Sequence, residues 1–150
     1  MYRKTISLWR YPLTLLSLFG LLWVVLAIAP VFRKDWLLEN MLVFIAVPIL
    51  VLTARHLRFS NFTYACLFVF FSLHAIGAHY TYSLVPYDQW FQALTGGSLN
   101  EMLGFERNHF DRLIHFLYGL LVAPAAVQIF AHYGRYPRVW AYFFPLLFMA

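Results

Sequence analysis

Four apolar stretches, each long enough to cross a lipid bilayer, dominate this chain of 150 residues. They lie near residues 12–32, 37–54, 62–85 and 113–133, and a fifth begins near Trp140. The chain is 63% hydrophobic and only 11% charged, and a soluble domain of this size has no room to bury so much Leu, Val and Phe. We therefore predict an all-α fold, a multi-pass transmembrane helix bundle with four full spans.

The fifth apolar run is shorter than a span. Only a dozen residues follow Arg138, whereas a transmembrane helix needs about 20. We expect a truncated fifth span. Residues 1–150 are then a single integral membrane domain that is incomplete at its C-terminus.

Charged residues are distributed unevenly between the two sides of the predicted bundle. Seven of the eleven Lys and Arg residues lie in the N-terminal tail and in the second and fourth connections, while all six acidic residues lie in the first and third. Basic residues mark the cytoplasmic side, so we predict a multi-pass membrane protein with a cytoplasmic N-terminus. Because the basic residues flank helices, the expected partner is the lipid bilayer and not nucleic acid.

The third connection, residues 86–112, is predicted to be a structured outer loop. Residues 87–94 have the pattern of a short amphipathic helix on the membrane surface. Ser98 followed by Glu101 is a capping-box pattern that starts a second short helix. The glycines expected to end these two helices are Gly96 and Gly104. Long loops with their own structure often carry function.

Three ionisable residues near the outer surface suggest a metal site. His79 is 17 residues beyond Phe62 and His115 is 18 residues before Tyr133, so the two imidazoles have almost the same depth. Asp111 and His115 are four residues apart and share one helix face. Three protein ligands with an open position are typical of a catalytic metal site. We expect His79, Asp111 and His115 to hold a divalent metal ion.

Six further polar residues are candidates for supporting that site. His74 lies deeper on the same helix as His79 and is expected to hydrogen-bond a ligand. A tyrosine is expected to orient the substrate, and an arginine to attract an anionic headgroup. The supporting residues are His74, Tyr80, Tyr82, Arg107, Asn108 and Arg112. The leading hypothesis is metal-assisted chemistry on a lipid or envelope-derived substrate.

Simpler interpretations of the same residues stay open. Asn108 and Asp111 fit a helix N-cap with an acid in the first turn, and Arg107 is spaced to pair with Asp111. His115 can hydrogen-bond a neighbouring helix. The protein would then be a non-catalytic binding, channel or assembly protein. A third hypothesis makes His79 and His115 the axial ligands of a haem.

Two segments carry a resemblance to a known family. Residues 74–82 read His-Ala-Ile-Gly-Ala-His-Tyr-Thr-Tyr, and residues 107–116 read Arg-Asn-His-Phe-Asp-Arg-Leu-Ile-His-Phe. Together with Pro86 they resemble the YjdF family of predicted bacterial inner-membrane proteins, over nearly the whole chain. The resemblance implies no reaction. It implies a location in the bacterial inner (plasma) membrane, about six helices, and a C-terminal part with a Tyr-Glu-Leu-Ile-Glu-Trp-like stretch and an Asp-rich segment. If those acids belong to the site, this chain carries half of it.

Overall fold

The computed structural model describes residues 2–134, 139, 140, 142 and 143, and its described elements are all helices. Their bounds are α1 Tyr2–Leu26, α2 Arg33–Glu39, α3 Met41–Thr53, α4 Asn61–His79, α5 Tyr87–Thr95, α6 Leu99–Leu103 and α7 Phe110–Tyr133. Four segments are long and apolar enough to cross a membrane: Leu8–Leu26, Arg33–Thr53, Asn61–His79 and Phe110–Tyr133. The predicted helical bundle with four spans is confirmed. The expected fifth span near Trp140 falls largely outside the described residues.

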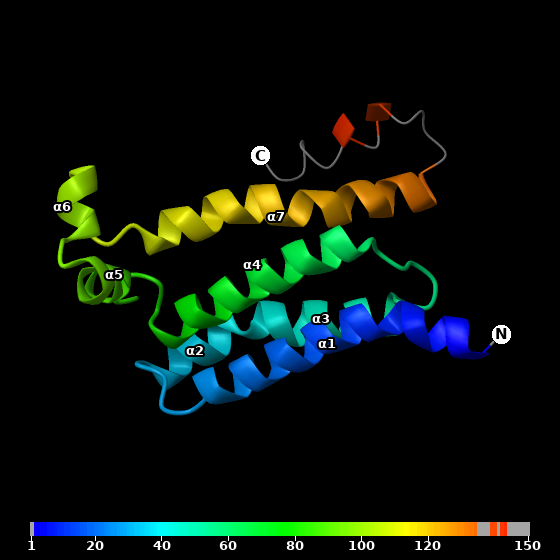
Figure 1. Ribbon diagram of the computed structural model, residues 1–150, viewed down its shortest axis with the longest axis horizontal. Helices are drawn as coiled ribbons and strands as arrows, with labels where there is room; N and C mark the ends of the chain where they lie inside the picture. Colours follow the sequence, from blue (N-terminus) through cyan, green and yellow to red (C-terminus); the bar gives the residue numbers. More distant parts are fainter. Residues whose placement is uncertain (1, 135–138, 141, 144–150) are drawn as a thin grey trace.

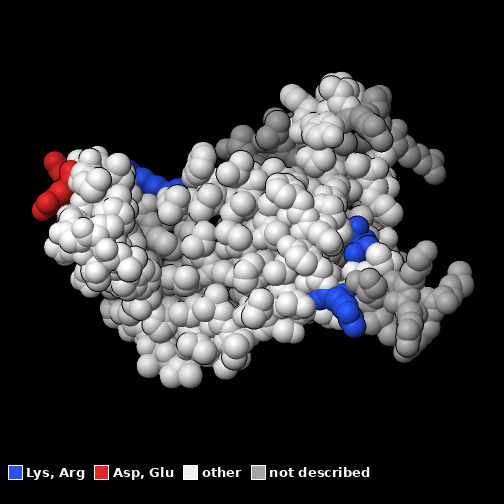
Figure 2. All heavy atoms as spheres, in the orientation of Figure 1, with Lys and Arg blue, Asp and Glu red and all other residues white. Residues whose placement is uncertain are grey.

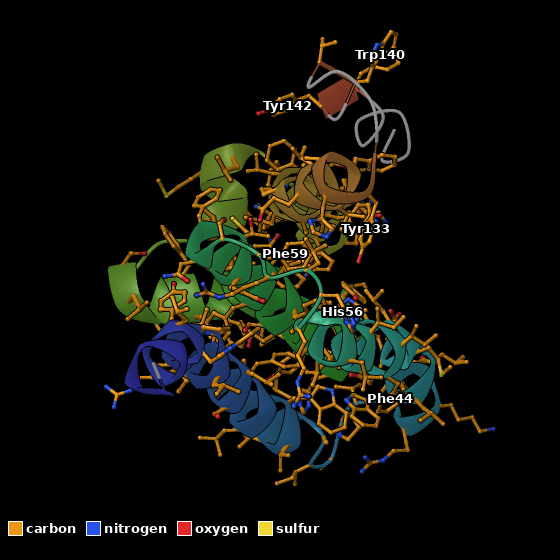
Figure 3. The ribbon with its side chains drawn as sticks, turned by 90° about the vertical axis from the view of Figure 1, so that its right-hand side faces the viewer. Phe44, His56, Phe59, Tyr133, Trp140 and Tyr142 are labelled. Carbon is orange, nitrogen blue, oxygen red and sulfur yellow. The ribbon has the colours of Figure 1, made fainter. Side chains whose placement is uncertain are left out.

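Helix α4 is the centre of the bundle. It runs between α7 and α1 and packs against both (Figure 1). Half of its apolar window is buried inside the protein, against 11–17% for the other three spans. The other spans therefore leave most of their apolar side chains for lipid, as expected when the bilayer is the solvent. Viewed from the end that carries the N-terminus, the buried Phe59 lies between α4 and α7 (Figure 3).

The second span is built from two helices, α2 and α3, that meet at Asn40. This side chain is fully buried, and its amide donates to the Trp36 carbonyl at 2.7 Å. Its Oδ1 accepts from Trp23 Nε1 on α1 at 2.5 Å. The Trp23, Trp36 and Phe44 rings surround this contact, with centroids 5.5 to 6.5 Å apart. A buried amide is tolerated among apolar rings because both its ends are hydrogen-bonded.

The two ends of the bundle differ in charge. We call the end with the N-terminus and the connection after α3 the basic end, because its connections contain no carboxylate. The opposite end, with residues 27–32, α5 and α6, is the acidic end. On the face seen in Figure 2, Asp and Glu are visible only over the acidic end, whereas Lys and Arg are visible at both ends.

At the basic end, polar side chains join α7 to the start of α4. Gln128 Oε1 accepts from the Ser60 amide at 2.9 Å, and its amide donates to Thr63 Oγ1. Ser60 Oγ also accepts from the Thr63 amide and so caps α4. These bonds fix the register of α7 against the central helix.

Residues 86–112 contain two short helices, α5 and α6. Helix α5 ends at Gly96 with φ 81°, and α6 ends at Gly104 with φ 67°, a left-handed conformation that favours glycine. Ser98 Oγ caps α6 by accepting from the Glu101 amide at 3.1 Å. The Asp88 carboxylate joins the two helices, because it accepts from Ser98 Oγ at 3.0 Å and from the Asn100 amide at 2.9 Å.

Candidate functional site

The structure does not bring His79, Asp111 and His115 together. His79 Nδ1 contacts the Leu26 carbonyl of α1 at 2.8 Å, so this ring is directed toward α1. His115 is exposed on α7, and its Nδ1 contacts the Asp111 carbonyl of its own helix at 2.8 Å. Within residues 2–134 and the four described positions beyond them, no group of three His, Cys, Asp or Glu residues is close enough to hold a metal ion.

The predicted convergence is therefore not found, and the reason is geometric. Equal depth along two helices fixes the height of two side chains but not the direction in which each leaves its helix. His79 leaves α4 on the side of α1, and α7 packs elsewhere on α4. Asp111 instead pairs with Arg107 at 3.8 Å, which is the simpler interpretation that the four-residue spacing allowed.

The remaining predicted residues make hydrogen bonds and ring contacts within the acidic end. Asn108 donates to the Val85 carbonyl at 2.7 Å and accepts from the Phe110 amide at 2.9 Å. It thus binds a first-turn amide of α7, although the N-cap position itself is His109. Arg112 Nη1 contacts His109 Nδ1 at 3.1 Å, and Tyr80 packs its ring on His79 and Trp90.

The structure assembles a different polar group, which we call the Tyr82 cluster: Glu39, His74 and Tyr82. The Tyr82 hydroxyl lies 2.6 Å from His74 Nδ1, and His74 Nε2 lies 3.1 Å from the Glu39 carbonyl. A carbonyl oxygen only accepts, so Nε2 must carry the ring proton. In the neutral ring Nδ1 is then an acceptor, and the Tyr82 hydroxyl donates to it. The hydrogen bonds fix the tautomer of His74.

The turn after α4 places Tyr82 over its own helix. Thr81 and Tyr82 have φ angles of 52° and 54°, in the left-handed region, and the Tyr82 amide donates to the Gly77 carbonyl at 2.7 Å. The chain therefore reverses, and the Tyr82 ring lies directly on Gly77. A Cβ atom at Gly77 would come within 2.6 Å of Tyr82 Cδ1, closer than two carbon atoms can pack. Glycine is required here for close approach, not for its backbone angle.

The surroundings keep Tyr82 neutral. Burial raises the pKa of the Tyr82 phenol, and the negative charge of the nearby Glu39 carboxylate raises it further. A phenolate is therefore strongly disfavoured at this position. Tyr82 can pass a proton from one neighbour to another, but it does not hold a negative charge itself.

The arrangement has the logic of an acid–base site. A hydroxyl contacts a histidine base, and the opposite nitrogen of that base is held by a third group. Two successive non-glycine residues in the left-handed region also cost about 1–3 kcal/mol each. Such strain is often concentrated where a side chain must be held in a functional position.

Comparison with known proteins agrees with this architecture. Residues 11–150 match the model of a family described as a predicted membrane protein, DUF2238. The chain belongs to this family. It is also similar to the inner membrane protein YjdF of Escherichia coli (strain K12), with 34% identity over 106 residues. The match covers 71% of this chain but 46% of that relative, so the chain spans about half of the relative's length.

No solved structure matches this chain. The family match and the four apolar spans establish an integral membrane protein and confirm the resemblance expected from residues 74–82 and 107–116.

Two polar residues of this region were absent from the predicted site. Glu39 and Asn40 lie where the first connection meets the apolar run 37–54, and polar groups at this depth are costly and often functional. That signal was present in the sequence. The role of Gly77 could not be predicted from the sequence. It depends on the Tyr82 ring, which folds back onto α4 although Tyr82 lies five residues further along the chain.

Proposed function

We propose that this membrane protein carries an acid–base site, the Tyr82 cluster, that takes a proton from the polar head of an amphiphilic molecule. The substrate class is a lipid or an envelope-derived molecule with a hydroxyl or ammonium group in its head. The observation that carries the proposal is the hydroxyl–histidine–carbonyl chain, with contacts of 2.6 and 3.1 Å.

The cluster can accept a proton without forming a phenolate. The substrate group donates to the Tyr82 oxygen while the Tyr82 proton moves to His74 Nδ1. Tyr82 is neutral before and after this transfer, in agreement with its raised pKa. The charge ends on the His74 ring, where the Glu39 carbonyl already accepts from Nε2 and the Glu39 carboxylate lies near Tyr82. Such proton transfers contribute about 10²–10⁴-fold to a reaction rate.

The position of the cluster supports an amphiphilic substrate. Its residues come from the end of α2, from α4 and from the turn after α4, at the acidic end of the bundle. Nearby, α5 and α6 expose Trp90, Leu94 and Met102, a pattern typical of a surface in contact with lipid headgroups. We further propose that this end faces outward from the bacterial inner membrane, since seven of the eleven basic residues lie toward the other side.

The test uses the purified protein in nanodiscs made from a bacterial lipid extract, with products followed by mass spectrometry. We expect conversion of a lipid by the wild type, and its loss in Tyr82→Phe and in His74→Gln. Tyr87→Phe is the matched control, because its hydroxyl bonds only Asn100 and the His109 amide within the described structure. Equal conversion by wild type and Tyr82→Phe, or no conversion by any of them, would remove the acid–base proposal and favour a binding or assembly role.

The metal hypothesis has its own test. Elemental analysis of the purified protein would restore it if a stoichiometric divalent metal were lost in His79→Ala and in His115→Ala. We place the chemistry on Tyr82 because its partners lie within hydrogen-bond distance, whereas His79 and His115 bond to separate backbone carbonyls.

A further inference from the structure

A hollow in the membrane-spanning wall lies on the basic-end side of the Tyr82 cluster. We call it the α1–α3 groove. Its volume is about 400 Å³. Helices α1 and α3 meet through the Trp23 and Phe44 rings, and the hollow lies on the basic-end side of this contact, between the two helices and α4. The side chains that form its walls are Leu16 and Phe19 of α1, Val47 and Leu50 of α3, and Leu67 and Phe71 of α4.

The groove has the depth of one membrane leaflet. Trp9 lines its mouth and Phe19 its inner wall. These residues are ten positions apart on α1, which is about 15 Å at the helical rise. The hydrocarbon core of a bilayer is about 30 Å thick. A hydrocarbon tail that enters beside Trp9 therefore reaches the bilayer centre near Phe19.

The mouth of the groove is positively charged and held in place. Arg55 lines it and makes no hydrogen bond or ion pair with any residue that the structure describes. Arg58 donates to the Leu8 carbonyl at 2.6 Å and lies 5.6 Å over the Trp9 ring, which fixes that ring at the headgroup level. The basic end has no carboxylate to neutralise these charges.

We propose that the α1–α3 groove binds one anionic phospholipid, with an acyl chain between α1 and α3 and the phosphate on Arg55. The apolar walls match the hydrocarbon tail, the leaflet-length depth matches its extent, and the Arg55 guanidinium matches the headgroup. The phosphate forms charge-assisted hydrogen bonds with arginine, and the headgroup preference follows from net charge, because a zwitterionic headgroup adds a positive charge that opposes the attraction to a basic site. The lipid completes the packing that α3 lacks in the protein.

The test is native mass spectrometry of the detergent-purified protein with phosphatidylglycerol or phosphatidylcholine of identical acyl chains. We expect one retained phosphatidylglycerol. Leu16→Trp fills the groove and should abolish retention, whereas Leu18→Trp, exposed on the same helix and outside the groove, should not. Arg55→Gln should weaken phosphatidylglycerol binding by about five-fold, the effect of one basic residue near an anionic surface. Lys34→Gln at the acidic end is its control.

Three results would overturn the proposal. Several lipids bound without headgroup preference and without response to Leu16→Trp would indicate annular lipid only. A dimer that holds no lipid and separates in Leu16→Trp would identify a second copy as the occupant. Unchanged retention in both Leu16→Trp and Val47→Trp, with melting temperatures like that of the wild type, would place the lipid elsewhere. Val47→Trp fills the groove from the opposite wall. It keeps the test valid if Leu16→Trp fails to fold.

Discussion

Replacing Gly77 by alanine should damage the turn that positions Tyr82. The added Cβ would lie within 2.6 Å of Tyr82 Cδ1 and 3.0 Å of Cζ. The ring cannot stay where it is. It must swing away from α4, and its hydroxyl then leaves His74 Nδ1, with which it now makes a contact of 2.6 Å.

The expected cost follows from three opposing contributions. Loss of the hydrogen bond costs about 0.5–1.5 kcal/mol. Displacing a packed ring to admit a methyl group costs about 1–3 kcal/mol. Alanine in a helix interior recovers about 0.5–1 kcal/mol relative to glycine. We expect a net loss of about 0.5–4 kcal/mol in the free energy of unfolding, with a central value of about 2 kcal/mol.

The assay is equilibrium unfolding in mixed detergent micelles, with Gly119→Ala as the matched control. Gly119 is also in a membrane helix, but a Cβ there meets no atom within 4 Å among the described residues. Gly119→Ala should therefore be neutral or slightly stabilising. Removing the ring should also remove the clash, so Gly77→Ala should cost nothing in a Tyr82→Ala background. If Gly77→Ala and Gly119→Ala have the same effect, or if the cost persists without the Tyr82 ring, the reasoning is refuted.

Three further predictions concern other parts of the structure. Asp88→Asn weakens the contacts between α5 and α6, so limited proteolysis should cut residues 86–112 faster, and an unchanged rate would contradict that role. A thiol placed at Gln92 should react with an impermeant reagent outside intact cells and one at Arg58 should not; the reverse pattern would invert the proposed orientation. Folding raises the pKa of Tyr82, so above pH ~10 the unfolded chain loses the Tyr82 phenol proton before the folded chain does. The free energy of unfolding should therefore fall as pH rises above that value. The fall should be shallower in Tyr82→Phe, and identical slopes would contradict the raised pKa.

Helix positions were largely predictable from the sequence because the bilayer demands long apolar runs. The main error was at the end of the third span, expected at residue 85 and found at His79. Residues 80–85 are apolar enough to continue a helix, yet Tyr82 turns back over Gly77. Local hydropathy cannot show such a reversal, since the tertiary contact of the ring determines it.

The loop was more predictable than the site. Gly96, Ser98 and Gly104 act through local backbone chemistry, which their order in the sequence reveals. The site depends on the direction in which each side chain leaves its helix. His79 and His115 have matched depth but separate carbonyl partners, so depth alone could not predict whether the two side chains converge.

The proposed acid–base site requires that Tyr82 donates a hydrogen bond to a His74 ring whose proton is held on Nε2. Nitrogen-15 NMR of histidine-labelled protein in nanodiscs near neutral pH measures this directly, with His74→Gln identifying the signal. We expect a single neutral tautomer with Nε2 protonated, and a shift of the Nδ1 resonance in Tyr82→Phe. An Nδ1-protonated ring, rapid exchange between tautomers, or an Nδ1 resonance that is unchanged in Tyr82→Phe would contradict this hydrogen-bond arrangement.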